Sequence, residues 1–136
     1  MTITGRCHCG AISYEVSGEA AYEALCHCGD CRRHAGAPMV GWAAFPAGAV
    51  RIAGSPSIYR SSESGRRHFC GACGTGLFYS NEVALPGLLD IQAGTFDDPG
   101  ARPPQIHVQT AERLAWMDGI DSLPKFARYP GQAEDI

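Results

Sequence analysis

The sequence contains neither a long apolar run nor a long run of charge. Its longest apolar stretch, residues 39–50, is interrupted by Gly41, Pro46 and Gly48, whereas a membrane-spanning helix needs roughly 20 apolar residues. The first seven residues, Met1-Thr-Ile-Thr-Gly-Arg-Cys7, lack the apolar core of a secretory signal. These absences predict a cytoplasmic protein with no membrane partner.

An excess of positive charge is also missing. The chain has 11 basic and 14 acidic side chains and a formal net charge of -3. Nucleic acids and anionic membranes are bound by net basic surfaces, so neither is expected as a partner. Hydrophobic residues make up 45% and charged residues 18% of the 136 residues. This composition is typical of a folded globular domain rather than of a disordered chain.

Long helices are not expected either, because 17 glycines and 9 prolines are spread along the chain. Ile12, Tyr14 and Val16 alternate with polar residues, which is the pattern of a half-buried strand. We expect short helices over residues 30–35 and 111–117, and strands over residues 12–16, 22–26, 40–45, 50–53, 57–60, 66–70, 77–80, 88–94 and 105–109. The sequence therefore predicts one mainly β domain over residues 1–130, mostly antiparallel with little helix, followed by a flexible tail over residues 131–136.

Cysteine, in contrast, is abundant, with seven residues. An odd number in a chain without a visible signal peptide favours metal binding or catalysis over disulfides. The cysteines form three groups in the sequence, namely Cys7-x-Cys9, Cys26-x-Cys28-x-x-Cys31 and Cys70-x-x-Cys73.

Ligand counting divides the seven thiols into four and three, because a structural zinc site is closed by four ligands. The middle group can face one ion alone and is called the cysteine trio (Cys26, Cys28, Cys31). The other four form the cysteine quartet (Cys7, Cys9, Cys70, Cys73). The quartet is expected to close a structural zinc site that supplies folding energy. The trio leaves one position open on a second zinc, as catalytic zinc sites do. The sequence thus predicts two zinc ions per chain.

Other interpretations of the trio remain open at this point. A histidine could complete the second site and make both sites structural. His34, three residues after Cys31, is the stronger candidate, whereas His27 lies between two ligands and is expected to point away from the ion. The four-cysteine spacing of iron–sulfur clusters is absent. A zinc-stabilised binding module without catalytic activity is the alternative function.

Two arginine pairs accompany the cysteines. Arg32 and Arg33 directly follow the trio and, with His34, are candidate substrate-binding residues, because guanidinium groups bind carboxylates. A solvated pair on a loop is the competing interpretation. Arg66 and Arg67 precede Cys70 and are expected on the surface of a hairpin.

Longer motifs around these residues resemble those of a known family. They are Gly5-Arg-Cys-His-Cys-Gly10, Cys26-His-Cys-Gly-Asp-Cys-Arg32, Tyr59-Arg-Ser-Ser62, Phe69-Cys-Gly-Ala-Cys-Gly74, Gly94-Thr-Phe-Asp-Asp-Pro99, His107, Trp116 and Asp121-Ser-Leu-Pro124. Over residues 5–126 the chain resembles the glutathione-dependent formaldehyde-activating enzyme family, also called GFA or centromere-protein-V-like.

The resemblance implies an Mss4-like β-tent, built from short antiparallel sheets, with a structural zinc on the quartet and a catalytic zinc on the trio. It also implies carbon–sulfur lyase chemistry, in which a thiol, glutathione in the named enzyme, adds to formaldehyde and gives S-hydroxymethylglutathione. The expected partners are a small glutathione-like thiol and an aldehyde. Because one fold serves many substrates, the resemblance does not fix the substrate of this chain.

Overall fold

The computed structural model of the chain describes residues 2–131. These residues form strands β1 (Thr2–Arg6), β2 (Ser13–Ser17), β3 (Tyr22–Cys26), β4 (Val40–Pro46), β5 (Val50–Ala53), β6 (Ser57–Arg60), β7 (Gly65–Phe69), β8 (Gly76–Asn81), β9 (Leu88–Gln92) and β10 (Ile106–Val108). The α-helix is α1 (Gly29–Ala35), and short 3-10 helices span Ala47–Ala49, Ala93–Thr95, Pro99–Ala101, Thr110–Glu112 and Ala115–Ser122. The predicted tail lies outside the described residues, apart from Gly131.

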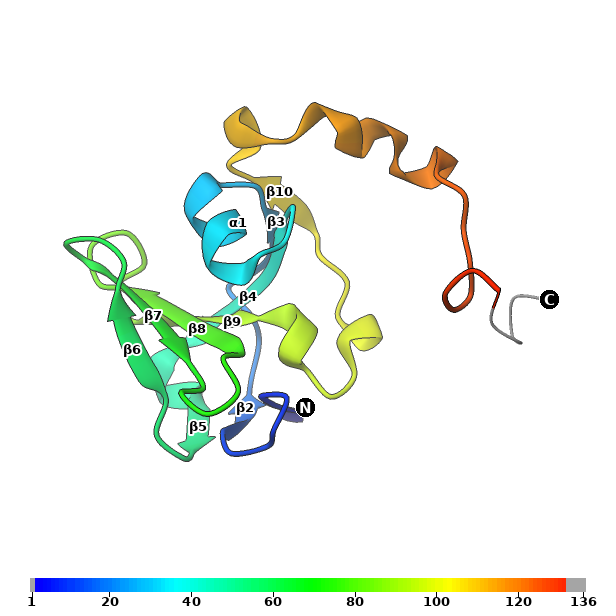
Figure 1. Cartoon of the computed structure of the whole chain (residues 1–136). Coiled ribbons are helices and arrows are strands. Elements are labelled where there is room, and N and C mark those ends of the chain that lie inside the picture. The colour runs from blue at the N-terminus through cyan, green and yellow to red at the C-terminus, as the bar shows by residue number, and fades with distance from the viewer. Residues whose placement is uncertain (1, 132–136) are drawn as a thin grey trace.

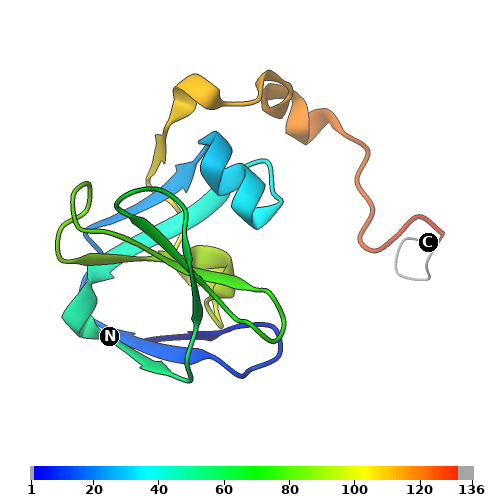
Figure 2. The ribbon, with the colours of Figure 1, turned by 60° about the vertical axis from the view of Figure 1, so that its left-hand side comes forward.

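The strands form two sheets. The smaller has the order β1-β2-β5, and the larger has the order β10-β3-β4-β9-β8-β7-β6. All neighbours are antiparallel except β10 and β3, which pair in parallel. Figures 1 and 2 show α1 at the end of the body opposite to the small sheet. The expected mainly β architecture with little helix is therefore confirmed.

At its centre the larger sheet is buried on both faces, because β4 has apolar residues on both of its sides. Ala43 and Phe45 belong to the main core between the two sheets, together with the buried apolar residues of β1, β2, β8 and β9. Tyr14 of the small sheet meets Phe78 of the large sheet edge to face, with ring centroids 5.3 Å apart. Trp42 projects to the opposite face and packs with Cys26 and Cys31. The second face of the sheet is thus the one that carries the cysteine trio.

The segment after β10 differs from the expected helix over residues 111–117. It forms two separate 3-10 turns, because Arg113 and Leu114 between them have extended backbone. A helix of that length is stable only when an apolar face packs on the body, and Met117 is the one buried residue among residues 110–131. The expectation of one helix over residues 111–117 is therefore wrong.

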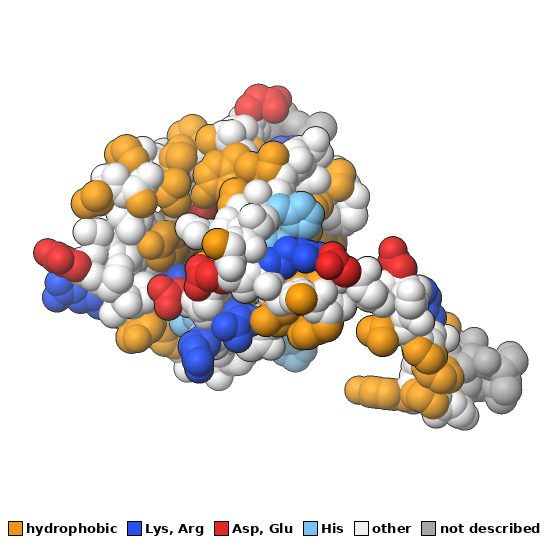
Figure 3. Space-filling model, turned by 90° about the horizontal axis from the view of Figure 1, so that it is seen from above, with side chains coloured by type: hydrophobic (Ala, Val, Ile, Leu, Met, Phe, Trp, Pro, Cys, Tyr) orange, Lys and Arg blue, Asp and Glu red, His pale blue; other side chains and the backbone are white. Residues whose placement is uncertain are grey.

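Residues 110–131 form an arm that reaches away from the body, as Figures 1 and 3 show. All residues from 118 to 131 are exposed. Large apolar side chains are exposed on the arm, among them Trp116, Leu123, Phe126 and Tyr129. Within residues 2–131, no helix is both long enough and apolar enough to cross a bilayer.

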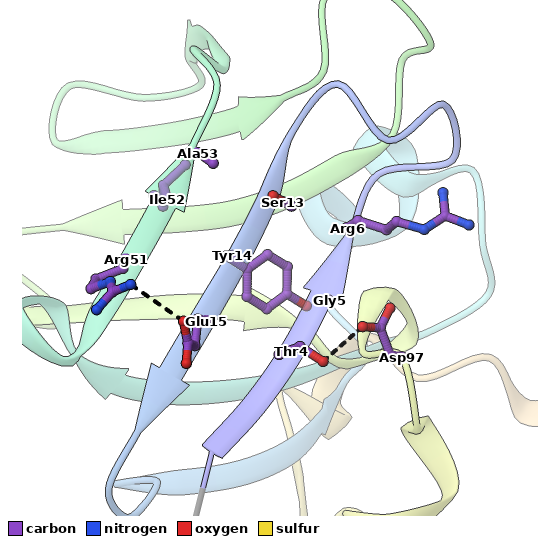
Figure 4. A pocket seen from close by; sticks show the side chains of 10 residues that line it. All are labelled: Thr4, Gly5, Arg6, Ser13, Tyr14, Glu15, Arg51, Ile52, Ala53 and Asp97. Atoms are coloured by element: carbon purple, nitrogen blue, oxygen red, sulfur yellow. Dashed lines mark hydrogen bonds and ion pairs between the residues drawn. The ribbon is translucent and has the colours of Figure 1, made fainter.

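β1 was not predicted as a strand, because only one of its two buried residues, Ile3, has a large apolar side chain. The other is a glycine, Gly5. The glycine is required by a close approach: a Cβ at Gly5 would overlap the hydroxyl of Tyr14 and the carbonyl oxygen of Thr95. Figure 4 shows the Tyr14 ring against Gly5, within a hollow of about 480 Å³ on the small sheet. None of the residues that line this hollow is a cysteine.

Replacing Gly5 with alanine is expected to destabilise the fold by about 1–3 kcal/mol, the usual cost of an overpacked core position. Tyr14 cannot move easily, since it also bonds Thr95 Oγ1 at 2.7 Å and packs on Phe78. Urea unfolding would measure the change. Gly94→Ala is the matched control, because nothing lies within 4 Å of a Cβ at Gly94. Equal stability of the two variants would contradict this account of Gly5.

Candidate metal centres

Two tight turns that are about sixty residues apart in the sequence bring the cysteine quartet together. One turn follows β1, and the other connects β7 to β8. The four sulfur atoms lie within 4.8 Å of one another. The same four residues were grouped from the sequence, and their role as metal ligands stays a prediction.

Both turns have the same construction, in which a glycine directly follows the second cysteine. Gly10 and Gly74 have φ angles of 82° and 84°, which favour glycine. Their amides donate to the carbonyl oxygens of Cys7 (3.2 Å) and Cys70 (2.7 Å), the first cysteine of each turn. The glycine therefore closes the reversal that points both thiols of each turn to the same side.

Sulfur separations in the quartet fit a tetrahedral metal ion. Cys9 Sγ lies 3.7 Å from both Cys7 Sγ and Cys70 Sγ. Zinc–sulfur bonds of about 2.3 Å in a tetrahedron place the sulfurs about 3.8 Å apart. A disulfide would need about 2.05 Å, and all seven cysteines are free. The donor set therefore suits a thiolate-bound cation.

The cysteine trio is assembled where β3 passes into α1. Cys26 is the last residue of β3, Cys28 is the N-cap of α1, and Cys31 lies in its first turn. The Cys28 sulfur accepts the amide hydrogen of Cys31 at 3.2 Å, which is the usual capping bond of a helix start. The first backbone amide of α1, at Gly29, donates a hydrogen bond to Glu112 Oε1 at 3.1 Å. The three sulfurs lie within 4.8 Å of one another.

Arg67 donates to the trio from β7. Its two terminal nitrogens lie 3.7 and 3.8 Å from Cys31 Sγ, and its guanidinium lies 4.8 Å from the centre of the Tyr79 ring. The side chain is only 5% exposed, and within residues 2–131 no carboxylate forms an ion pair with it. A buried guanidinium needs an anionic partner, so this contact favours a negatively charged trio. The expectation that Arg67 lies on the hairpin surface is wrong.

As free thiols, the trio shares its protons unevenly. The hydrogen bond with Cys31 lowers the pKa of Cys26, and the same bond together with burial raises the pKa of Cys31. Burial also raises the pKa of Cys28. Three such close thiols cannot all ionise without a cation, because each new negative charge opposes the next. A cation with affinity for sulfur would resolve this conflict, and zinc fits the donor set.

A pocket of about 550 Å³ opens beside the trio. The three cysteines line it together with aromatic and apolar side chains of β3, β4, β8 and β10, among them Trp42, Tyr79, Ile106 and Val108. A volume of this size is typical of small-molecule sites. The trio thus faces a space that a substrate can enter.

The structure locates the other predicted site residues elsewhere. Arg33 is exposed, Arg32 and His34 are half-buried, and none of the three lines the pocket. His34 stacks on Tyr59 with centroids 6.2 Å apart, and burial followed by the nearby Arg67 lowers its pKa. Among the described residues, the ligand atoms grouped at the trio are three sulfurs and no histidine nitrogen. A substrate-binding role for Arg32, Arg33 and His34 stays a prediction.

His27 lies between Cys26 and Cys28 in the sequence, and its side chain points away from the cysteine trio. Its Nε2 lies 2.9 Å from Nδ1 of His107, and burial followed by the charge of His107 lowers its pKa. This histidine pair ties β3 to β10 through side chains, in addition to their backbone pairing. It therefore supports the strand that ends in Cys26.

Two polar residues of the pocket were missed from the sequence. Arg67 and Asp90 both line the pocket, and each is 5% exposed. Signals for both existed: strand alternation places Arg66 and Arg67 on opposite faces, and Asp90 interrupts an otherwise apolar strand, Leu88-Leu-Asp-Ile91.

Comparison with known proteins agrees with the sequence motifs. The family model described as "Glutathione-dependent formaldehyde-activating enzyme" matches residues 2–112. A protein of Halomonas elongata, named "Putative glutathione-dependent formaldehyde-activating enzyme", is 30% identical over 98% of this chain and 92% of its own length. A crystal structure of a Rhodobacter sphaeroides protein shares the fold, with a TM-score of 0.62 and 21% identity over 77% of this chain and 99% of that one. The chain therefore belongs to the glutathione-dependent formaldehyde-activating enzyme family.

Proposed function

We propose that this protein is a zinc-dependent carbon–sulfur lyase that forms and breaks the adduct of a small thiol with an aldehyde. The family name supports glutathione and formaldehyde as the substrate classes. The observation that carries the proposal is the trio of thiols at the wall of a 550 Å³ pocket. In this proposal the quartet holds a structural zinc ion, and Cys26, Cys28 and Cys31 hold a catalytic one.

A zinc ion held by Cys26, Cys28 and Cys31 would supply Lewis-acid chemistry, which polarises an aldehyde oxygen or lowers the pKa of a thiol. The surrounding residues have separate tasks. Arg67 donates to Cys31 Sγ and stabilises negative charge on the trio. Trp42 and Tyr79, whose rings meet at 6.2 Å, form an aromatic wall that restricts water. The Glu112 carboxylate holds the amide of Gly29 and so fixes the start of α1.

The reaction balances without an oxidant or reductant. The thiol sulfur forms a bond to the carbonyl carbon, the carbon–oxygen double bond becomes single, and the thiol proton ends on oxygen. In the reverse direction the carbon–sulfur bond breaks, and the hydroxyl proton returns to sulfur. The protein has to position the two reactants and stabilise the charge that develops on sulfur and oxygen.

The direct test is acceleration of adduct formation above the spontaneous rate. Zinc-loaded protein would be mixed with a panel of thiols and aldehydes, and adducts would be followed by proton exchange NMR. We expect acceleration with glutathione and formaldehyde, its loss after chelation, and its return with zinc. Absence of acceleration with every pair, at two zinc ions per chain, would reject the enzyme and favour a zinc-stabilised binding module.

A further inference from the structure

The second face of the large sheet carries a row of pocket residues that runs across its strands. Tyr22 is opposite Ala44, Ala44 is opposite Asp90, Asp90 is opposite Tyr79, and Tyr79 is opposite Arg67. Residues directly opposite one another project to the same face of a sheet. Tyr22, Asp90, Tyr79 and Arg67 all line the pocket that contains the trio. Apart from Asp30, Gln109 and Glu112, which lie outside the sheet, the polar residues of the pocket therefore gather at two points, one at the trio and Arg67, the other at Tyr22 and Asp90.

Asp90 is an unusual residue for the middle of a buried strand. It is 5% exposed, and its Oδ2 accepts the hydroxyl hydrogen of Tyr22 at 2.5 Å. Its Oδ1 is buried and has no hydrogen-bond partner among residues 2–131. No cation of this part of the chain forms an ion pair with it. A buried carboxylate with a free oxygen is unfavourable, and a ligand that donates to this oxygen would remove the cost.

The charge of Asp90 at neutral pH is consistent with such a ligand. Burial raises the pKa of the carboxyl to about 6, while the bond from Tyr22 acts in the opposite direction. The group is therefore mainly ionised near pH 7.5 and offers a negative charge to the pocket.

We propose that Asp90, oriented by Tyr22, binds the ammonium group of the thiol substrate at the end of the pocket remote from the trio. This inference rests on the proposed function, because it assigns the sulfur of the same substrate to the trio. It deepens that function by assigning the residue that selects a thiol with a free amino group. Asp90 is thus a specificity residue rather than a residue that touches the reacting atoms.

The spacing of these residues in the sheet supports a thiol whose amino group lies far from its sulfur. Tyr22 and Cys26 lie on the same face of β3 and are four residues apart, which corresponds to about 13 Å along a strand. Asp90 lies two strands away from β3, across β4, so a thiol held at the trio reaches it only if its amino group is many bonds from its sulfur. A γ-glutamyl-cysteinyl thiol has about eight bonds between sulfur and its ammonium nitrogen, and spans about 10 Å when extended. Free cysteine is much too short.

The test compares glutathione with N-acetylglutathione, which has the same thiol and no ammonium charge. With zinc-loaded wild type, we expect N-acetylation to raise KM at least about tenfold and to change kcat little, since a paired buried charge is lost. In Asp90→Asn, the ratio of the two KM values is expected to fall to about 1. Asp30→Asn is the matched control, because exposed Asp30 lines the same pocket beside the trio, and it should retain the wild-type ratio.

Binding measured by calorimetry with the same two thiols separates this inference from the proposed function. If no thiol is turned over but wild type still prefers glutathione and Asp90→Asn does not, the ammonium site stands and the enzyme proposal fails. Equal binding of both thiols by wild type overturns the inference whether or not the variant folds. A preference that persists in Asp90→Asn overturns it as well.

Discussion

Cys70→Ser is expected to prevent stable folding under conditions in which the wild type is folded. Cys70 is 1% exposed and belongs to the main core, where its sulfur lies 3.7 Å from that of Cys9. Structural zinc sites contribute roughly 10–16 kcal/mol in small metal-binding domains, and a whole domain is stable by about 5–15 kcal/mol. Loss of the ion alone would therefore remove most of the stability.

Circular dichroism during heating would measure this effect, with zinc content determined on the same samples. His8→Ala is a suitable control, because His8 lies between two quartet cysteines but its side chain is exposed. We expect the control to melt close to the wild type. A Cys70→Ser protein that melts within a few degrees of the wild type would show that the quartet does not carry the fold. Strong chelation should reproduce the variant in the wild-type protein.

Cys28→Ser is expected to abolish adduct formation while the fold survives. Serine caps helices well, so its oxygen can accept the Cys31 amide that the Cys28 sulfur accepts now. The hydroxyl is, however, a poor zinc ligand compared with a thiolate. Even residues that only support a ligand contribute about 10–100-fold to metal affinity or activity, so removal of a ligand should lower kcat/KM at least about a hundredfold.

Zinc content distinguishes this result from general damage. Wild type should contain two zinc ions per chain and Cys28→Ser only one, with the quartet still filled and the melting temperature little changed. Cys28 is a better choice than Cys31, because replacement of Cys31 would also leave buried Arg67 without its sulfur partner. Full activity at one zinc ion per chain would remove the trio from the proposed chemistry.

The sequence was most informative where a pattern of neighbouring residues determines the local structure. Ile12, Tyr14 and Val16 predict the β2 region by alternation, and the short Cys70-x-x-Cys73 spacing predicts a pair of neighbouring thiols. These features depend on neighbours within a few residues. The start of α1 near Asp30 also depends on residues close in the sequence, because the helix begins directly after its N-cap, Cys28.

The parts that were missed depend on which strands become neighbours. Arg67 is buried because β7 pairs with β8 in a register that sets it beside Tyr79, whereas alternation in its own segment shows only that Arg66 and Arg67 face opposite sides, not which side is buried. Asp90 and Tyr22 are 68 residues apart and meet only because β4 lies between their strands. Arg32 and Arg33 adjoin the trio in sequence, yet the helix directs them away from the pocket lining. Proximity along the chain was thus a poor guide to which charged residues share the pocket.

β10 determines when this pocket can be completed during synthesis. The partners of the large sheet from β3 to β9 lie within residues 22–92, and the ribosome releases the chain from its N-terminus. Ile106 and Val108 of β10 form the remaining wall of the pocket, and they pair with Ala24 and Cys26, about 80 residues earlier. Such a distant contact forms late. The nascent chain therefore presents the trio at an open sheet edge, where an ion can reach the thiols before that wall exists.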